Sequence, residues 1–242
     1  MESDHKLLSI GIGNSKIGRF IEILVVFLPI LIAIQIIQPL TEDQLITKMM
    51  IIWVANVAML VLVWISLKLR NQTWQDFGLK FQWPGINTSM ITLLRSFLVC
   101  ILAVAAYVLG TMVMANITGM PQQADMSNYS YLQNNLPLLI VSLLGVYIVS
   151  SFGEEVIYRA FLMNRISELG FNGKTGKILV VLISSMIFGL VHFQWGITGI
   201  VATFFMGLVM GIAYLKYRKN LWILVWAHVY MDTMLLVPLF YG

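Results

Sequence analysis

Three ionisable side chains stand inside a long apolar stretch of this sequence. Glu154, Glu155 and Arg159 fall within residues 151–166, SFGEEVIYRAFLMNRI, at the end of an apolar run that begins near residue 136. A charge at hydrocarbon depth costs roughly 2.5–3.5 kcal/mol, so such residues are rare and usually functional. A carboxylate in this position can act as a base toward water. We therefore take this segment as the centre of a candidate active site.

The spacing within the segment predicts a division of roles. Residues four apart share one face of a helix, so Glu155 and Arg159 are expected to pair and to neutralise each other. Glu154 points in another direction, with Tyr158 on its face, and is left free for chemistry. The alternative is a buried structural cluster in which all three charged residues hold helices together.

Two further apolar runs carry ionisable residues. Phe188 and His192 are four apart on the fifth run, and His228 and Asp232 are four apart on the seventh. A lone buried histidine is more often a hydrogen-bonded core residue than a catalyst, and a His and Asp at this spacing can simply bind each other. Convergence on one cavity is nevertheless the least costly placement for three charged sites inside a membrane.

Composition places the chain in the membrane. Of its 242 residues 59% are hydrophobic and 11% are charged, and the mean hydropathy is +0.86. Soluble domains carry about 25% charged residues, so a soluble enzyme is excluded. The net charge of +4 needs no nucleic-acid partner to explain it. The single cysteine, Cys100, excludes an internal disulfide and a cysteine-cluster zinc site.

The pattern of apolar runs predicts an all-α bundle that forms one integral membrane domain over residues 1–242. Each run is near the roughly 20 residues that span the hydrocarbon layer. Residues 1–19 are polar and are expected to be cytosolic. The polar connection 117–135 is either a loop or a lid. The seven expected spans are residues 20–40, 46–67, 88–115, 136–164, 178–194, 197–215 and 221–240.

Basic residues predict the orientation in the membrane. They gather before the first run and in every second connection, while the alternate connections carry little positive charge apart from Lys48. The positive-inside rule then predicts a cytosolic N-terminus and an external C-terminus. The small size favours a multi-pass protein of a bacterial plasma membrane. The basic residues are Lys6, Lys16 and Arg19; Lys68, Arg70 and Lys80; Arg165, Lys174 and Lys177; and Lys216, Arg218 and Lys219.

The three motifs, taken in order, resemble a known family. The patterns are Glu154-Glu155-x-x-x-Arg159, Phe188-x-x-x-His192 and His228-x-x-x-Asp232. They resemble the motifs of the CPBP family, also called Abi, which contains type II CAAX prenyl proteases and bacteriocin-processing and immunity-type proteins. The resemblance covers about residues 130–240, which would be the catalytic core. Each motif alone is weak, and the ordered triple is fairly specific.

The resemblance implies an intramembrane endopeptidase of the glutamic type, with a polar cavity that opens toward the cytosol. Glu154, helped by His192, would activate a water molecule, and His228 and Asp232 would stabilise the oxyanion. Glu155 and Arg159 match supporting positions. Family members often have Asn where this chain has Asp232, and an ionised Asp only accepts hydrogen bonds. Asp232 is therefore expected to orient His228, which would be the main oxyanion donor.

The expected partners are membrane lipids and a peptide substrate, either a CAAX-type prenylated peptide or a small membrane or secreted peptide. No cofactor is expected. The nearest alternative is a zinc metalloprotease with Glu154, His192 and His228 as ligands, although the sequence has no H-E-x-x-H motif. A proton-coupled transporter is another alternative, because chains of Glu, His and Asp also conduct protons. A non-enzymatic scaffold or immunity protein is a third.

Overall fold

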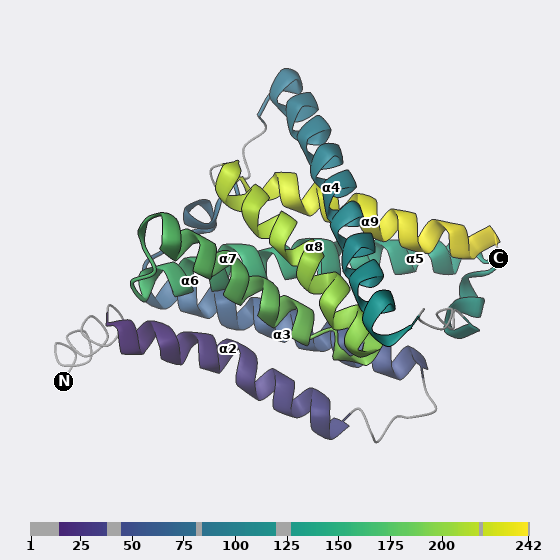
Figure 1. The fold of residues 1–242 in the computed structure, drawn as a ribbon, viewed down its shortest axis with the longest axis horizontal. Helices are drawn as coiled ribbons and strands as arrows, with labels where there is room; N and C mark the ends of the chain where they lie inside the picture. Colours follow the sequence, from purple (N-terminus) through teal and green to yellow (C-terminus); the bar gives the residue numbers. More distant parts are fainter. Residues whose placement is uncertain (1–14, 38–44, 81–83, 120–126, 218–219, 242) are drawn as a thin grey trace.

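The computed structural model describes residues 15–37, 45–80, 84–119, 127–217 and 220–241, and this part of the chain is helical without strands. It contains seven helices that are long and apolar enough to cross a membrane, which confirms the predicted all-α membrane bundle (Figure 1). The orientation of the N-terminus stays a prediction. The main helices are α2 (Lys16–Ile37), α3 (Leu45–Leu69), α4 (Ile86–Thr118), α5 (Leu136–Val146), α6 (Met163–Glu168), α7 (Gly173–Leu190), α8 (Gly196–Lys216) and α9 (Leu221–Tyr241).

The fourth span is one continuous 33-residue helix over Leu136–Glu168. Its ends are the α-helices α5 and α6, and its middle consists of two π-helical stretches, η4 (Tyr147–Phe152) and η5 (Glu155–Leu162). Residues 155–166 are all buried, which makes this helix the core of the bundle. A π-helical turn holds more residues than an α-helical turn, and such turns occur frequently at functional sites.

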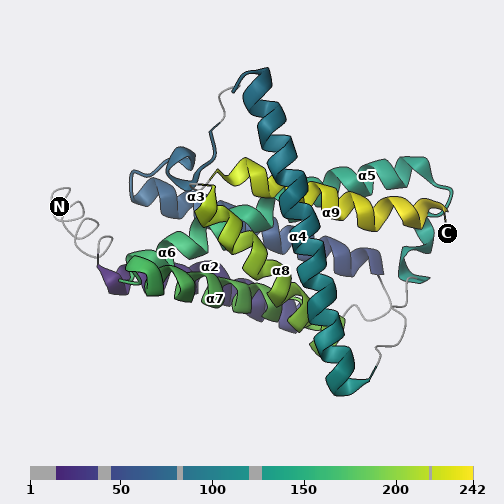
Figure 2. The ribbon, with the colours of Figure 1, turned by 45° about the horizontal axis from the view of Figure 1, so that its top comes forward.

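The remaining helices surround this central helix. It contacts α3, α7 and α9 along its π-helical part, whereas α2 packs against α3 and α6 at the edge of the bundle. Helix α4 crosses α8 and α9 at a steep angle, and the second view shows α5 beside α9 (Figure 2). The site residues therefore come from the middle of the bundle, and α2 and α4 are peripheral to them.

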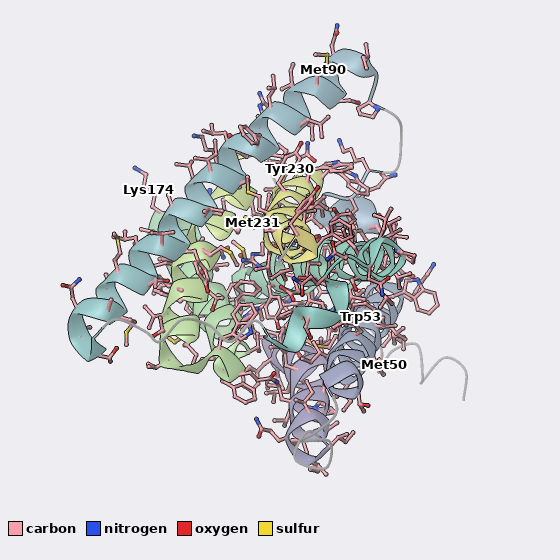
Figure 3. All side chains as sticks on the ribbon, turned by 90° about the vertical axis from the view of Figure 1, so that its right-hand side faces the viewer. Met50, Trp53, Met90, Lys174, Tyr230 and Met231 are labelled. Carbon is pink, nitrogen blue, oxygen red and sulfur yellow. The ribbon has the colours of Figure 1, made fainter. Side chains whose placement is uncertain are left out.

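Many apolar side chains of α4 point away from the bundle, as expected for a lipid-facing helix. Leu94 and Met90 are more than half exposed. In the side view α4 runs diagonally across the outside of the molecule, with Tyr230 and Met231 of α9 beside it (Figure 3). Exposed apolar surface of this extent would be unfavourable in water and is stable in lipid.

Glycines set the closest helix contacts. A Cβ atom added at Gly110 of α4 would lie 2.8 Å from the Cα atom of Ala202 in α8. Gly207 and Gly211 of α8 face Ser185 and Val181 of α7 at 3.2 Å and 3.1 Å on the same measure. The absence of a side chain lets the backbones approach, as is common between membrane helices.

Charged residues form a network at one end of the bundle. Arg165 is fully buried, and its Nε atom lies 2.8 Å from Oε2 of Glu22. Glu22 also binds Ser66 and Arg70, so one carboxylate joins α2, α3 and α6. Arg19 pairs with Glu168 at the same end. The start of α2 and the ends of α3 and α6 lie at this end, next to segments that the positive-inside rule predicts to be cytosolic, so the rule predicts that this end faces the cytosol.

Candidate active site

Glu155 is the carboxylate that holds the centre of the site together. Its Oε1 atom lies 2.9 Å from Nδ1 of His228 and 3.3 Å from a terminal nitrogen of Arg159. The predicted pairing of Glu155 with Arg159 is therefore present in the structure. The guanidinium of Arg159 also stacks over the ring of Phe188, 4.1 Å from its centroid. All four side chains are buried, so this cluster fixes α9 and α7 against the central helix.

Glu154 has the more open position of the two neighbouring carboxylates. Its side chain is 14% exposed, against none for Glu155. Its Oε2 atom lies 4.0 Å from Nε2 of His228, at the limit of an ion pair, and its Oε1 atom accepts a 3.4 Å hydrogen bond from Ser150. Among the described residues Glu154 makes no contact with a lysine or arginine close enough to be an ion pair. This carboxylate is thus available to a substrate or to water.

Asp232 lies on the same side of the His228 ring as Glu154, in an arrangement that differs from expectation. Its Oδ2 atom is 3.9 Å from Nε2 of His228, which is too long for a hydrogen bond. It accepts instead a 2.6 Å hydrogen bond from Ser151. The ring nitrogen that orients His228 is Nδ1, and its partner is Glu155. Glu155 is thus the carboxylate that hydrogen-bonds the His228 ring, and Asp232 lies near the opposite ring nitrogen, beyond hydrogen-bond distance.

His192 lies beyond the helix on which we expected it. Helix α7 ends at Leu190, and His192 occupies the turn before the short 3₁₀ helix η6 (Phe193–Trp195). Its ring packs between Phe188 and Trp195, with centroid distances of 4.7 Å and 4.8 Å. Its Nδ1 atom lies 2.7 Å from the carbonyl oxygen of Phe188, which can only accept, so Nδ1 carries a hydrogen.

The connection of His192 to the other site residues is indirect. Arg159 stacks on Phe188, which also contacts the His192 ring. Within the described part of the chain His192 makes no hydrogen bond or ion pair with Glu154. The structure thus brings Glu154, Glu155, Arg159, His228 and Asp232 into one cluster and leaves His192 at its edge.

Two serines complete the cluster, and our sequence reasoning did not include them. Ser150 Oγ lies 3.4 Å from Oε1 of Glu154 and 3.4 Å from Nε2 of His228, and Ser151 binds Asp232. Both belong to the π-helical stretch η4. For Ser150 a usable signal was present in the sequence, because it precedes its partner Glu154 by four residues. Ser151 binds Asp232 on α9, a contact between helices that spacing within one helix does not indicate.

A comparison with protein families tests the resemblance. Residues 136–234 match the family described as type II CAAX prenyl endopeptidase Rce1-like. This match confirms the resemblance to the CPBP family, and the matched residues include all the predicted site residues. The match supports the prediction of a membrane protease, that is, a hydrolase that acts on a peptide. No curated protein and no solved structure matches the chain.

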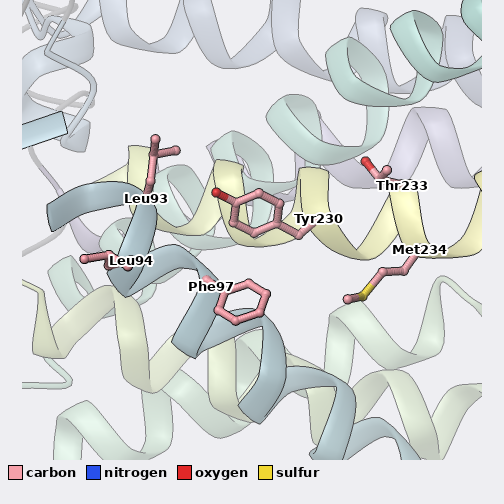
Figure 4. Close-up of a pocket in the computed structure, with 6 residues that line it drawn as sticks. All are labelled: Leu93, Leu94, Phe97, Tyr230, Thr233 and Met234. Atoms are coloured by element: carbon pink, nitrogen blue, oxygen red, sulfur yellow. The ribbon is translucent and has the colours of Figure 1, made fainter. Parts of the chain in front are cut away.

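Two apolar grooves border the Rce1-like region on the outside of α9. The larger, of about 410 Å³, lies between α4 and α9 (Figure 4). Within it Phe97 and Tyr230 meet edge to face at 6.0 Å. The second, of about 340 Å³, lies between η4 and α9 and is lined by Phe152 and Trp222 among others. Neither groove is lined by Glu154, His192 or His228. Both are therefore surfaces for apolar groups beside the charged cluster.

The zinc alternative requires Glu154, His192 and His228 as joint ligands. Zinc binds nitrogen and oxygen ligands at about 2.0–2.2 Å, so three ligands must converge on one point. Among the described residues no group of three or more His, Cys, Asp or Glu side chains is arranged to hold a metal ion. In the part of the chain that the structure describes, His192 packs between Phe188 and Trp195 and makes no hydrogen bond or ion pair with Glu154.

Proposed function

We propose that this protein is an intramembrane endopeptidase in which Glu154 activates a water molecule for attack on a peptide bond. One observation carries the proposal. Glu155 holds Nδ1 of His228, so the opposite ring nitrogen faces Glu154 at 4.0 Å and Asp232 at 3.9 Å. A base and a hydrogen-bond donor thus face a common space, as peptide hydrolysis requires.

The proposed steps use these groups in turn. Glu154 takes a proton from water while the water oxygen bonds to the carbonyl carbon of the substrate. The carbonyl oxygen becomes negative and accepts a hydrogen bond from Nε2–H of His228. Glu154 then gives its proton to the leaving nitrogen as the carbon–nitrogen bond breaks. Asp232 helps to stabilise the positive charge on His228, and Glu155 with Arg159 supports the ring.

His192 has an assisting role in this proposal. Its Nδ1 hydrogen is directed to the Phe188 carbonyl, so its Nε2 atom remains for the substrate or the water. Its position next to Trp195, at the start of the connection to α8, places it at the edge of the cluster. We propose that it acts on the bound substrate, together with Glu154, and that no metal takes part.

The proposed substrate is a CAAX-type prenylated peptide or another small membrane or secreted peptide. Such substrates share an apolar part that partitions into lipid and a peptide bond that must reach charged groups within the bundle. The site lies in the middle of a 33-residue membrane-spanning helix, which suits a substrate that enters from the bilayer. We propose a plasma membrane location, in a bacterium, on the small size of the chain.

The test compares the wild type with Glu154→Gln in lipid nanodiscs. Both are incubated with a library of prenylated and unmodified peptides, and the products are identified by mass spectrometry with and without a strong chelator. We expect cleavage by the wild type, unchanged by the chelator, and a loss of at least about 10³-fold in Glu154→Gln. His192→Phe, which keeps an aromatic ring, is expected to be impaired by about 10²-fold.

Glu168→Gln is the matched control, because Glu168 is a carboxylate on the same long helix at its far end. It should retain wild-type cleavage. Cleavage that a chelator abolishes and zinc restores would make Glu154 a metal ligand instead of a base. Full activity of Glu154→Gln would refute the proposed mechanism, and proton flux without cleavage would favour a transporter.

A further inference from the structure

Ser150 occupies a position between the two groups that the proposed reaction depends on. Its hydroxyl oxygen is 3.4 Å from Oε1 of Glu154 and 3.4 Å from Nε2 of His228. Within the described residues Ser150 is the one side chain that donates a hydrogen bond to Glu154. One hydroxyl thus lies within hydrogen-bond distance of both the proposed base and the proposed oxyanion donor.

The hydrogen-bond inventory of these groups fixes the direction of the contacts. A serine hydroxyl has one hydrogen to donate and two lone pairs that accept. Ser151 already donates to Asp232 at 2.6 Å, so the single hydrogen of Ser150 can serve Glu154. In the state that the proposed function requires, His228 carries hydrogen on both ring nitrogens. Before the substrate is bound, Ser150 accepts from Nε2–H, the hydrogen that the substrate oxygen accepts during the proposed reaction. The result is a chain from His228 through Ser150 to Glu154.

The backbone explains why this serine reaches the site. Ser150 lies in η4, one turn before Glu154, and the π-helical geometry there changes which side chains share a face. Ser151, the next residue, is fully buried and points to α9 as well. Two successive serines thus contact α9, where successive residues of a regular α-helix would diverge by about 100°.

We propose that Ser150 is a positioning residue that fixes the position of the Glu154 carboxylate relative to Nε2 of His228. This inference rests on the proposed function, because it assigns Ser150 a role in that reaction. Ser150 acts through Glu154 and His228. Loss of its hydroxyl is therefore expected to change the positions of these two side chains without unfolding the protein.

A spectroscopic test needs no substrate. The protein contains three histidines, so ¹⁵N-histidine labelling in nanodiscs gives few signals, and His228→Gln and His192→Gln assign them. We expect Ser150→Ala to shift the side-chain ¹⁵N signal of His228 Nε2 and to leave His192 unchanged. Ser150→Thr, which keeps the hydroxyl, should restore the wild-type signal. An unchanged His228 signal in Ser150→Ala would overturn the inference.

Ser142→Ala is the matched control. Ser142 is a buried serine on the same long helix, two turns before Ser150, and within the described ranges it makes no hydrogen bond with the cluster. The His228 signal should be the same as in the wild type. A shift as large as that of Ser150→Ala would overturn the inference, because a general loosening of the helix would then explain both.

Kinetics on a cleaved peptide supply the second readout. We expect Ser150→Ala to lower kcat by roughly 10- to 100-fold, the effect of one hydrogen bond to a charged group, while KM changes by less than about threefold. Ser150→Thr should recover most of the activity. Wild-type kcat in Ser150→Ala would overturn the inference and leave the proposed function intact. Absence of cleavage by the wild type would count against the proposed function, and the His228 signal would still decide the role of Ser150.

Discussion

Nδ1 of His228 and Oε1 of Glu155 lie 2.9 Å apart, and this contact separates the roles of two neighbouring glutamates. Glu155 is fully buried and has two cationic or proton-donating partners, His228 and Arg159. Glu154, one residue earlier, keeps an exposed edge and has Ser150 as its donor. Adjacent residues on a helix point about 100° apart, so one glutamate is enclosed by its partners while the other keeps the exposed edge on which the proposed reaction depends.

Removing the charge of Glu155 should destabilise the protein strongly. Glu155→Ala leaves Arg159 buried without an anion, which costs about 3–5 kcal/mol in comparable buried pairs. Glu155→Gln should cost less, because its amide oxygen can still accept from His228. The double variant Glu155→Gln/Arg159→Gln should recover part of the loss. The free energy of unfolding, measured by denaturant titration in mixed micelles, gives the coupling between the two sites. Strictly additive effects would show that the pair does not interact.

Replacing Asp232 with asparagine should preserve activity. The amide oxygen of Asn can accept the hydrogen bond that Ser151 now donates, and its NH₂ group can donate to an oxyanion. We expect kcat/KM of Asp232→Asn to stay within about tenfold of the wild type, and Asp232→Ala to lose more because Ser151 is left without its acceptor. A folded Asp232→Asn protein without activity would mean that the charge itself is required.

Adding a methyl group at Gly110 should weaken the crossing of α4 and α8. The new Cβ would lie 2.8 Å from the backbone of Ala202, which cannot move without shifting a whole helix. We expect Gly110→Ala to lower the free energy of unfolding by about 1–3 kcal/mol. Gly153→Ala is the control, because its Cβ would meet the flexible Leu60 side chain at 3.4 Å. Equal stability of the two variants would argue against a close crossing.

Loss of Glu22 should loosen α2 from the bundle. Its carboxylate binds Arg165, Arg70 and Ser66, and Arg165 is fully buried. Glu22→Ala should therefore cost about 3 kcal/mol or more, the range for breaking a buried ion pair. It should also speed hydrogen exchange of the α2 amides. Glu168→Ala, which removes a more exposed partner of Arg165, should have a smaller effect on both measurements. The reverse order would contradict a central role for Glu22.

Hydrophobicity and helical spacing made much of the fold predictable. A run of about 20 apolar residues has few alternatives to a membrane helix, because lipid cannot satisfy an unpaired backbone. The seven spans and the pairing of Glu155 with Arg159 follow from such local rules. The end of α7 did not follow from them, since the helix ends at Leu190 and His192 lies in the turn that leads to η6 and α8.

The sequence by itself determined that this is a membrane helical bundle, and the residue types and spacing of its motifs pointed to the family that residues 136–234 match. Only the tertiary structure decided that Glu155 rather than Asp232 hydrogen-bonds the His228 ring, and that Ser150 and Ser151 lie against His228 and Asp232. The physical reason is that the spacing of residues along the sequence determines only which of them share a face of one α-helix. The π-helical turns of the central helix and the packing of α9 against it select the partners between helices, and neither is encoded in the spacing of one motif.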